Sequence, residues 1–170
     1  MPIAHVALGA NLGDPLAALR TAVRALAAVG VVTAVSAVYR TSPVGPVAQP
    51  DYLNAAVTLD TGLSPKSLLA ELHAIERSLG RERRERWGPR TLDLDLIAYE
   101  GQRRDAEGVE LPHPRAHERE FVLRPLADIA PDLLLAGRPV RDLLAGLAPQ
   151  GVVRVAERLD PGPAAGPPPA

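Results

Sequence analysis

Residues 3–26, IAHVALGANLGDPLAALRTAVRAL, decide the fold class, because two different hydrophobic patterns follow one another within them. Residues 3–8 form a short apolar run, which is typical of a buried strand. Turn-forming residues follow, and Asp14 before Pro15 is the pairing that favours a helix start. Apolar residues then recur at helical spacing, at Leu16, Leu19, Val23 and Leu26. The stretch therefore predicts a strand followed by an amphipathic helix that ends at Gly30.

The remaining chain repeats this alternation of elements. Strands are predicted for residues 31–40, 52–61 and 91–99, and a second helix opens at Ser64-Pro65 and ends before Gly80. The order strand–helix–strand–strand–helix–strand predicts an α+β fold, a ferredoxin-like sandwich with an antiparallel sheet and helices packed on it. Further on we expect a short edge strand, a helix that Pro125 could break, and a short helix; they span residues 109–111, 116–126 and 140–147.

Length and composition predict one domain. A chain of 170 residues with 46% hydrophobic and 23% charged residues suits a single globular core. We assign residues 1–160 to this domain. Residues 161–170 are proline, glycine and alanine only, so we expect a disordered tail there.

Charge and cysteine usage exclude several classes of function. The net charge of -1 provides no field for recruiting nucleic acid or an anionic membrane. The absence of cysteine excludes disulfides and thiolate metal sites. No apolar run approaches the length that a membrane span needs, and the first residues lack the pattern of a signal peptide. We expect a cytoplasmic protein without nucleic-acid or membrane partners.

Two carboxylates alternate with leucines in the predicted strand at residues 91–99. Asp93 and Asp95 project from one face while Leu92, Leu94 and Leu96 enter the core. Paired carboxylates suit Mg²⁺, which prefers oxygen ligands and typically adds water and substrate phosphates. Taken alone, the same pattern also describes the solvated face of a half-buried strand.

The segment just before these carboxylates is strongly basic. Residues 77–90 contain six arginines and two glutamates, and they also hold the only tryptophan, Trp87. Guanidinium groups followed by carboxylates could bind a polyphosphate bridged by magnesium. Charged loops are more often merely solvated, and Trp87 could either cover a flat ligand or plug the loop.

Six segments, in order and in register, resemble the dihydropterin pyrophosphokinase family over about residues 3–147. They are residues 8–13 (LGANLG), 39–45 (YRTSPVG), 49–57 (QPDYLNAAV), 86–95 (RWGPRTLDLD), 111–115 (LPHPR) and 119–126 (REFVLRPL). Enzymes of this family transfer pyrophosphate from ATP to 6-hydroxymethyl-7,8-dihydropterin and release AMP in folate biosynthesis. The resemblance therefore implies the same reaction here, with Mg²⁺ as cofactor and two small-molecule substrates. We also expect a monomer.

The resemblance also implies residue roles. Asp93 and Asp95 resemble the ligands of two Mg²⁺ ions, and with them the catalytic set comprises Arg81, Arg83 and Arg90. The ATP-binding set is Glu76, Arg83, Arg90, His113 and Arg119. The pterin-binding set is Gly9, Thr41, Val44, Tyr52, Asn54, Trp87 and Phe121, with Asn11 nearby in the first loop.

Two positions depart from the family pattern, and two other functions remain open. Ala10 stands where serine is common, and Pro114 replaces an aromatic residue found in some members. A ferredoxin-like module that binds RNA or nucleotides without catalysis is one alternative, although residues 3–8 lack its stacking aromatics. A magnesium-dependent phosphohydrolase using Asp93 and Asp95 is the other.

Overall fold

The structure is a computed structural model that describes residues 1–43, 45–46, 48–79, 92–106 and 108–159. The elements of its main sheet are β1 (Ile3–Ala10), β2 (Val31–Val35), β3 (Tyr39–Thr41), β4 (Tyr52–Asp60), β5 (Asp93–Tyr99) and β10 (Val153–Arg154). The helices are α1 (Pro15–Leu26), α2 (Pro65–Ser78), the 3₁₀ turn η1 (Ala116–Glu118), α3 (Glu120–Ile129) and α4 (Val140–Gly146). Two small hairpins complete the described part: β6 (Arg104–Ala106) with β7 (Val109–Leu111), and β8 (Leu134–Leu135) with β9 (Arg138–Pro139).

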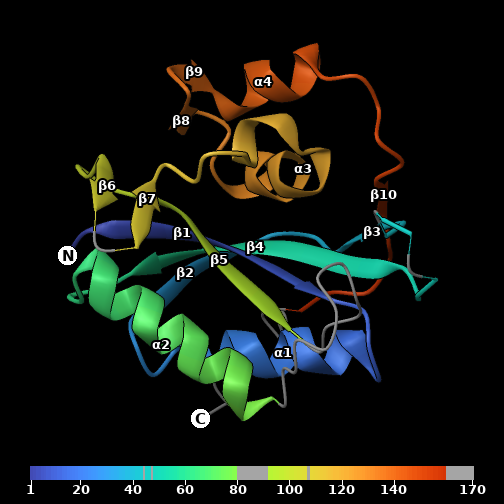
Figure 1. Cartoon of the computed structure of the whole chain (residues 1–170), viewed down its shortest axis with the longest axis horizontal. Helices are drawn as coiled ribbons and strands as arrows, with labels where there is room; N and C mark the ends of the chain where they lie inside the picture. Colours follow the sequence, from blue (N-terminus) through green and yellow to red (C-terminus); the bar gives the residue numbers. More distant parts are fainter. Residues whose placement is uncertain (44, 47, 80–91, 107, 160–170) are drawn as a thin grey trace, which may run out of the picture.

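The main sheet has the order β10-β3-β4-β1-β5, and β2 pairs with β4 on the same side as β3. All of these pairings are antiparallel, so β1 is flanked by β4 and β5 running in the opposite direction. Helices α1 and α2 cover one face of the sheet (Figure 1), as the ferredoxin-like prediction requires.

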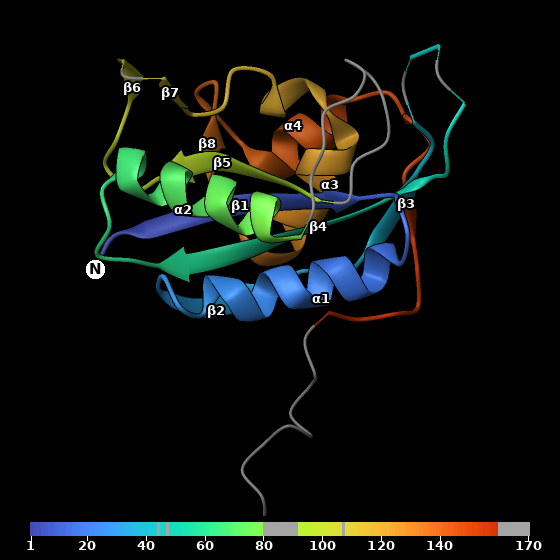
Figure 2. The ribbon, with the colours of Figure 1, turned by 60° about the horizontal axis from the view of Figure 1, so that its bottom comes forward.

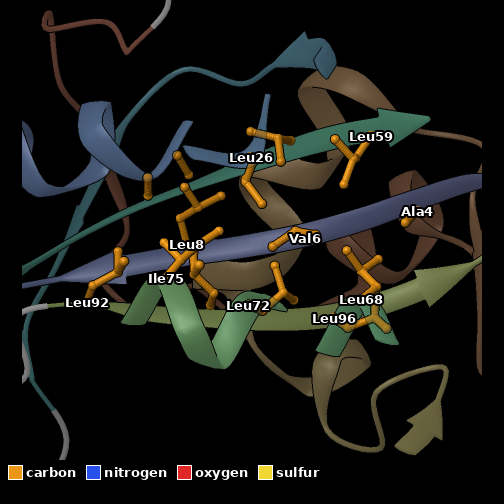
Figure 3. Close-up of a cluster of buried hydrophobic side chains, with 14 of the residues drawn as sticks. Ala4, Val6, Leu8, Leu26, Leu59, Leu68, Leu72, Ile75, Leu92 and Leu96 are labelled. Carbon is orange, nitrogen blue, oxygen red and sulfur yellow. The ribbon is translucent and has the colours of Figure 1, made fainter. Parts of the chain in front are cut away.

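The opposite face carries a second helical layer, formed by α3 and α4 (Figures 1 and 2). Leucines of α1, α2 and the central strands belong to one apolar cluster on the face of the sheet that α1 and α2 cover (Figure 3). Residues of α3 and α4 form the second cluster against Ala56 and Ile97. The central strands β1 and β4 are therefore buried on both faces, which explains why they read as apolar runs rather than as clean alternations.

Helix starts follow the sequence closely. The Asp14 carboxylate accepts a hydrogen bond from the Ala17 backbone N–H at 3.0 Å, and Ser64 caps α2 in the same way at Ser67. Proline occupies the first turn of both helices. Glycine is required at position 30, because a Cβ atom there would lie 2.3 Å from the Asp60 carbonyl oxygen. These local signals fix where the helices begin and how α1 returns to the sheet.

The single strand predicted for residues 31–40 is wrong in one respect, since the chain breaks into β2 and β3. At the break, Ser36 donates its backbone N–H to Ala56 O at 2.9 Å, and the Ser36 hydroxyl accepts from Ala56 N at 2.8 Å. A serine side chain thus replaces a backbone group in the ladder with β4. This replacement at Ser36 ends β2 before β3 begins, and both strands still pair with β4.

The predicted helix over residues 116–126 is also divided, but not at its proline. The break lies at Arg119, where the backbone is extended between η1 and α3, and Pro125 lies inside α3 without ending it. The other small elements β6, β8, β9 and β10 are too short to leave a sequence pattern. The tail predicted for residues 161–170 lies outside the described residues, and the domain limits stay a prediction.

Candidate active site

The ends of four strands meet at one end of the sheet. Gly9 lies opposite Asp93 on one side and opposite Asn54 on the other, and Asn54 in turn lies opposite Tyr39. Residues directly opposite one another project to the same face of a sheet. The pairing therefore gathers an aspartate, an amide and a tyrosine, from sequence positions far apart, on the α3 side of the sheet.

The alternation predicted in β5 is confirmed by burial. Leu92, Leu94 and Leu96 are at most 5% exposed and belong to the α1–α2 core, whereas Asp95 is exposed and Asp93 is partly exposed. Asp95 lies opposite Ala7, which lies opposite Ala56 of the α3-side core. Both carboxylates consequently open on the face that α3 covers only in part.

Asn54 is held by its neighbours in a fixed orientation. It is 5% exposed, and its Nδ2 donates to the Thr41 hydroxyl at 2.9 Å. A Cβ atom at Gly9 would lie 3.2 Å from Asn54 Oδ1, so only glycine leaves the amide oxygen its full space. The orientation of the Asn54 amide thus depends on residues of β1 and β3.

His113, in the chain beyond β7, lies near both the Asp95 carboxylate and the Arg119 guanidinium. The His113 backbone N–H donates to Ile97 O at 2.8 Å, which attaches this segment to β5. Burial lowers the pKa of His113; the Asp95 carboxylate acts in the opposite direction and Arg119 reinforces the effect of burial. His113 Nδ1 accepts from the Arg115 N–H at 3.3 Å, which leaves Nε2 as the donor of the neutral ring.

Arg119 and Phe121 form one unit at the start of α3. The Arg119 guanidinium carbon lies 5.7 Å from the centroid of the Phe121 ring, within the range of a cation–π contact. The Phe121 ring packs at the margin of the α3-side core. A basic group and an aromatic ring are thereby presented together beside the strand ends.

Tyr39 and Asp128 fasten α3 to β3. The Tyr39 hydroxyl donates to the Asp128 carboxylate at 2.9 Å, and the Ala37 N–H donates to the same carboxylate at 3.1 Å. Burial, followed by the bond to Asp128, raises the pKa of Tyr39 to about 12. This contact could not be predicted from the sequence, because a tyrosine and an aspartate 89 residues apart leave no local pattern.

Asn11 holds the loop that leads into β4. Its side chain is 2% exposed, and Nδ2 donates to Gln49 Oε1 at 2.8 Å and to Pro50 O at 3.0 Å. The loop after β1 is thereby tied to the residues just before Tyr52. Asn11 accordingly organises the loop next to the site.

Glu76 supports the strand that carries both aspartates. It is 3% exposed, and its Oε2 accepts the Leu94 backbone N–H at 2.8 Å. Leu94 stands between Asp93 and Asp95 in β5, which is the edge strand of the sheet. An edge strand has backbone groups without a sheet partner, and a buried carboxylate from α2 here satisfies one of them.

This contact gives a prediction for Glu76. The change Glu76→Ala is expected to cost about 1–3 kcal/mol of unfolding free energy by removing the acceptor of a buried N–H, and to lower kcat. Glu76→Gln retains an acceptor oxygen and should lose much less of both. Urea unfolding and steady-state rates measure the two effects. A raised KM for ATP with unchanged stability would instead support the predicted contact between Glu76 and the nucleotide.

Several predicted site residues lie outside the described residues. They are Val44, Arg81, Arg83, Trp87 and Arg90. Within the described chain, the structure brings the following predicted residues to the same end of the sheet: Gly9, Thr41, Tyr52, Asn54, Asp93, Asp95, His113, Arg119 and Phe121. Their roles toward substrates stay predictions.

The donor set fits magnesium better than a tightly ligated transition metal. Among the described residues there is no cluster of three or more histidine, aspartate or glutamate side chains able to hold a metal ion. Two carboxylates on one strand face, open to solvent, match the usual binding of Mg²⁺, which takes one or two carboxylates and completes its shell with water and substrate phosphates.

Comparison with known proteins places this chain in a class of phosphate-transferring enzymes. The family model described as 7,8-dihydro-6-hydroxymethylpterin-pyrophosphokinase (HPPK) matches residues 5–131. A 2-amino-4-hydroxy-6-hydroxymethyldihydropteridine pyrophosphokinase of Methylorubrum extorquens is 51% identical over 91% of this chain and 99% of its own. The enzyme of that name from Pseudomonas aeruginosa is 44% identical, over 89% and 95%. The chain belongs to the HPPK family.

Solved structures agree in fold. An HPPK-DHPS crystallised in complex with substrates superposes with a TM-score of 0.66 at 12% identity, over 85% of this chain. A Plasmodium falciparum HPPK-DHPS with pterin and p-hydroxybenzoate gives a TM-score of 0.65 at 16% identity. This chain spans 43% and 42% of those two chains.

HPPK enzymes use ATP, generally with Mg²⁺. None of the described helices is long and apolar enough to cross a membrane.

Proposed function

We propose that this protein transfers the pyrophosphoryl group of ATP to the hydroxymethyl oxygen of 6-hydroxymethyl-7,8-dihydropterin and releases AMP. In this reaction the pterin oxygen forms a bond to the β-phosphorus, and the bond from that phosphorus to the α,β-bridging oxygen breaks. The hydroxyl proton leaves to solvent. The observation that carries the assignment to a site is the meeting of Asp93, Asp95 and Asn54 at one end of the sheet, in a chain of the HPPK family.

Asp93 and Asp95 are the residues that would hold magnesium, and the proposal is for two ions. Bound Mg²⁺ neutralises phosphate charge and aligns the groups for displacement. The contribution of the chain is to fix the two carboxylates on a rigid strand. β5 is supported by pairing with β1 and by the Glu76 contact at Leu94. Preorganisation of this kind avoids reorganisation during the reaction.

His113 and Arg119 are proposed to contact the phosphates. The charges of Asp95 and Arg119 both act on the His113 ring, so the three side chains are near one another, and the neutral His113 ring has a donor at Nε2. Phosphoryl transfer depends chiefly on alignment and on stabilising charge at the phosphate oxygens. Arg81, Arg83 and Arg90 are proposed to complete this set, as the family resemblance implies.

The pterin is proposed to bind beside Asn54. The pterin ring presents an amide-like edge, and the Asn54 amide can both donate to and accept from such an edge. Tyr52 from β4 and Phe121 from α3 supply aromatic surface for the flat ring. Gly9 and Thr41 set the Asn54 orientation, and Val44 and Trp87 are proposed as further contacts.

Product analysis tests the proposed reaction. The protein is incubated with ATP and Mg²⁺, with and without 6-hydroxymethyl-7,8-dihydropterin, and AMP and ADP are quantified. Pterin-dependent AMP is the expected product. AMP or ADP formed equally without pterin would favour the phosphohydrolase alternative, and folded protein that binds ATP without turnover would favour the binding module. We further propose that the enzyme acts as a monomer in the cytoplasm, which sedimentation and cell fractionation test.

A further inference from the structure

The segment after α4 returns to the site from the far side of α3. Residues 148–159 lie beyond the part of the chain that the family model matches. Val153 and Arg154 form β10 and pair with Arg40 and Tyr39 of β3. The Val155 N–H donates to Val38 O at 2.9 Å, and Leu159 is 4% exposed. Figure 1 shows this segment running from α4 down to the edge of the sheet beside β3.

On its way, the segment binds the first turn of α3 through Gln150. The Glu120 backbone N–H donates to Gln150 Oε1 at 3.0 Å. The Gln150 backbone N–H donates to Glu120 Oε1 at 2.7 Å, and Gln150 Nε2 donates to Glu118 O at 3.1 Å. The arrangement resembles a capping box, except that the partner residue lies 30 positions away in the chain.

The first turn of α3 has no cap of its own. Its N-cap residue is Arg119, whose side chain makes no capping hydrogen bond. The first backbone N–H groups of any helix lack partners within the helix. Asp14 and Ser64 supply the acceptors at the starts of α1 and α2. At the start of α3, Gln150 of the distant segment supplies the acceptor instead.

Glu120 completes the attachment as a buried carboxylate. It is 4% exposed, and Arg124 donates to its Oε2 at 2.6 Å. Burial alone would raise the pKa of Glu120, but the bonds from Arg124, Gln150 and Val152 together lower it, so the carboxylate is charged at neutral pH. A buried charge is tolerated only where such partners satisfy it. The start of α3 is thus fixed to the returning segment by bonds from both sides.

We propose that Gln150 and Glu120 are positioning residues that hold Arg119 and Phe121 at the substrate site. Arg119 and Phe121 flank Glu120 in sequence and contact each other. The same segment pairs with β3, which carries Thr41, the partner of Asn54. The expected effect on substrate KM rests on the proposed function, whereas the expected change in the position of Phe121 does not.

The chain offers a direct reporter, because Phe121 is its only phenylalanine. Incorporation of 4-fluorophenylalanine gives a single ¹⁹F resonance that reports the environment of this ring without requiring turnover. The variant is Gln150→Ala, which removes one capping acceptor at an exposed position and should fold. The matched control is Glu157→Ala, an exposed residue of the same segment.

Gln150→Ala is expected to shift or broaden the ¹⁹F resonance and to raise the KM for the pterin about five- to tenfold, the size of a lost helix cap. The KM for ATP should rise as well, because Arg119 is proposed to contact the phosphates, whereas kcat should stay within about threefold, because Asp93 and Asp95 are not touched. Glu157→Ala should match the wild type in both readouts. An unchanged resonance or an unchanged pterin KM in Gln150→Ala overturns the inference. Failure of the proposed function would appear separately, as wild-type protein that forms no pterin-dependent AMP.

Discussion

Asp95→Asn is expected to lower kcat about a thousandfold, because loss of a magnesium-binding carboxylate removes several kcal/mol of transition-state stabilisation. The amide is nearly isosteric, and Asp95 is an exposed residue of β5, so the free energy of unfolding should change by no more than about 0.5 kcal/mol. The variant separates chemistry from folding. Higher Mg²⁺ concentrations should restore part of the lost rate if metal affinity is the main defect.

A matched carboxylate controls for the change in charge. Glu100, exposed in the turn that follows β5, is changed to glutamine and should leave kcat unaltered. Single-turnover rates and urea unfolding curves are measured for both variants. If the turnover of Asp95→Asn stayed within a few-fold of wild type, Asp95 would not be a magnesium ligand. Asp93 and Asp95 would then be ordinary solvent-facing residues of β5.

Asn54→Leu is expected to weaken pterin binding about a hundredfold, which corresponds to about 2.7 kcal/mol. A site built to bind a ligand through hydrogen bonds loses most of its affinity when the polar group is replaced by an apolar one of similar size. The variant also removes the donor to Thr41, so stability should fall by about 1 kcal/mol. ATP binding should be preserved, because the proposed phosphate contacts lie on β5 and beyond β7.

Calorimetric titration with the pterin and with a non-hydrolysable ATP analogue distinguishes the two effects. Thr58→Val is the control, since Thr58 lies on the same face of β4 at its far end and is likewise buried and bonded, there to His5. It should cost stability without affecting pterin affinity. Equal loss of pterin affinity in both variants would show that Asn54 acts only through the fold.

The fold could be predicted from the sequence because the patterns that define its helices and strands are local. Asp14 and Ser64 cap the helices that they were expected to cap, and the alternation of Asp93, Leu94 and Asp95 reports the two faces of an edge strand. The break between β2 and β3 could not be predicted, because it depends on a hydrogen bond from the Ala56 N–H to the Ser36 hydroxyl across the sheet. The second helical layer also hides the alternation in β4, since both of its faces are buried.

The site was predicted through family motifs more than through residue chemistry. The motifs contain the residues that the pairing of β1 with β4 and β5 brings together. They did not reveal what holds them in place. The contact of Glu76 with the Leu94 backbone could not be predicted from the sequence, and the partners of Asp128 and Gln150 are distant in sequence. Contacts that depend on tertiary packing leave no periodicity or spacing in the sequence.

The most direct test of the account is to follow the γ-phosphate of ATP through a single turnover. ATP labelled at this phosphate is mixed with excess protein, Mg²⁺ and 6-hydroxymethyl-7,8-dihydropterin, and the labelled products are separated. Transfer of an intact pyrophosphoryl group predicts label in the pterin product together with an equal amount of AMP. Label recovered as inorganic phosphate alongside ADP, with no labelled pterin, would contradict the proposed reaction.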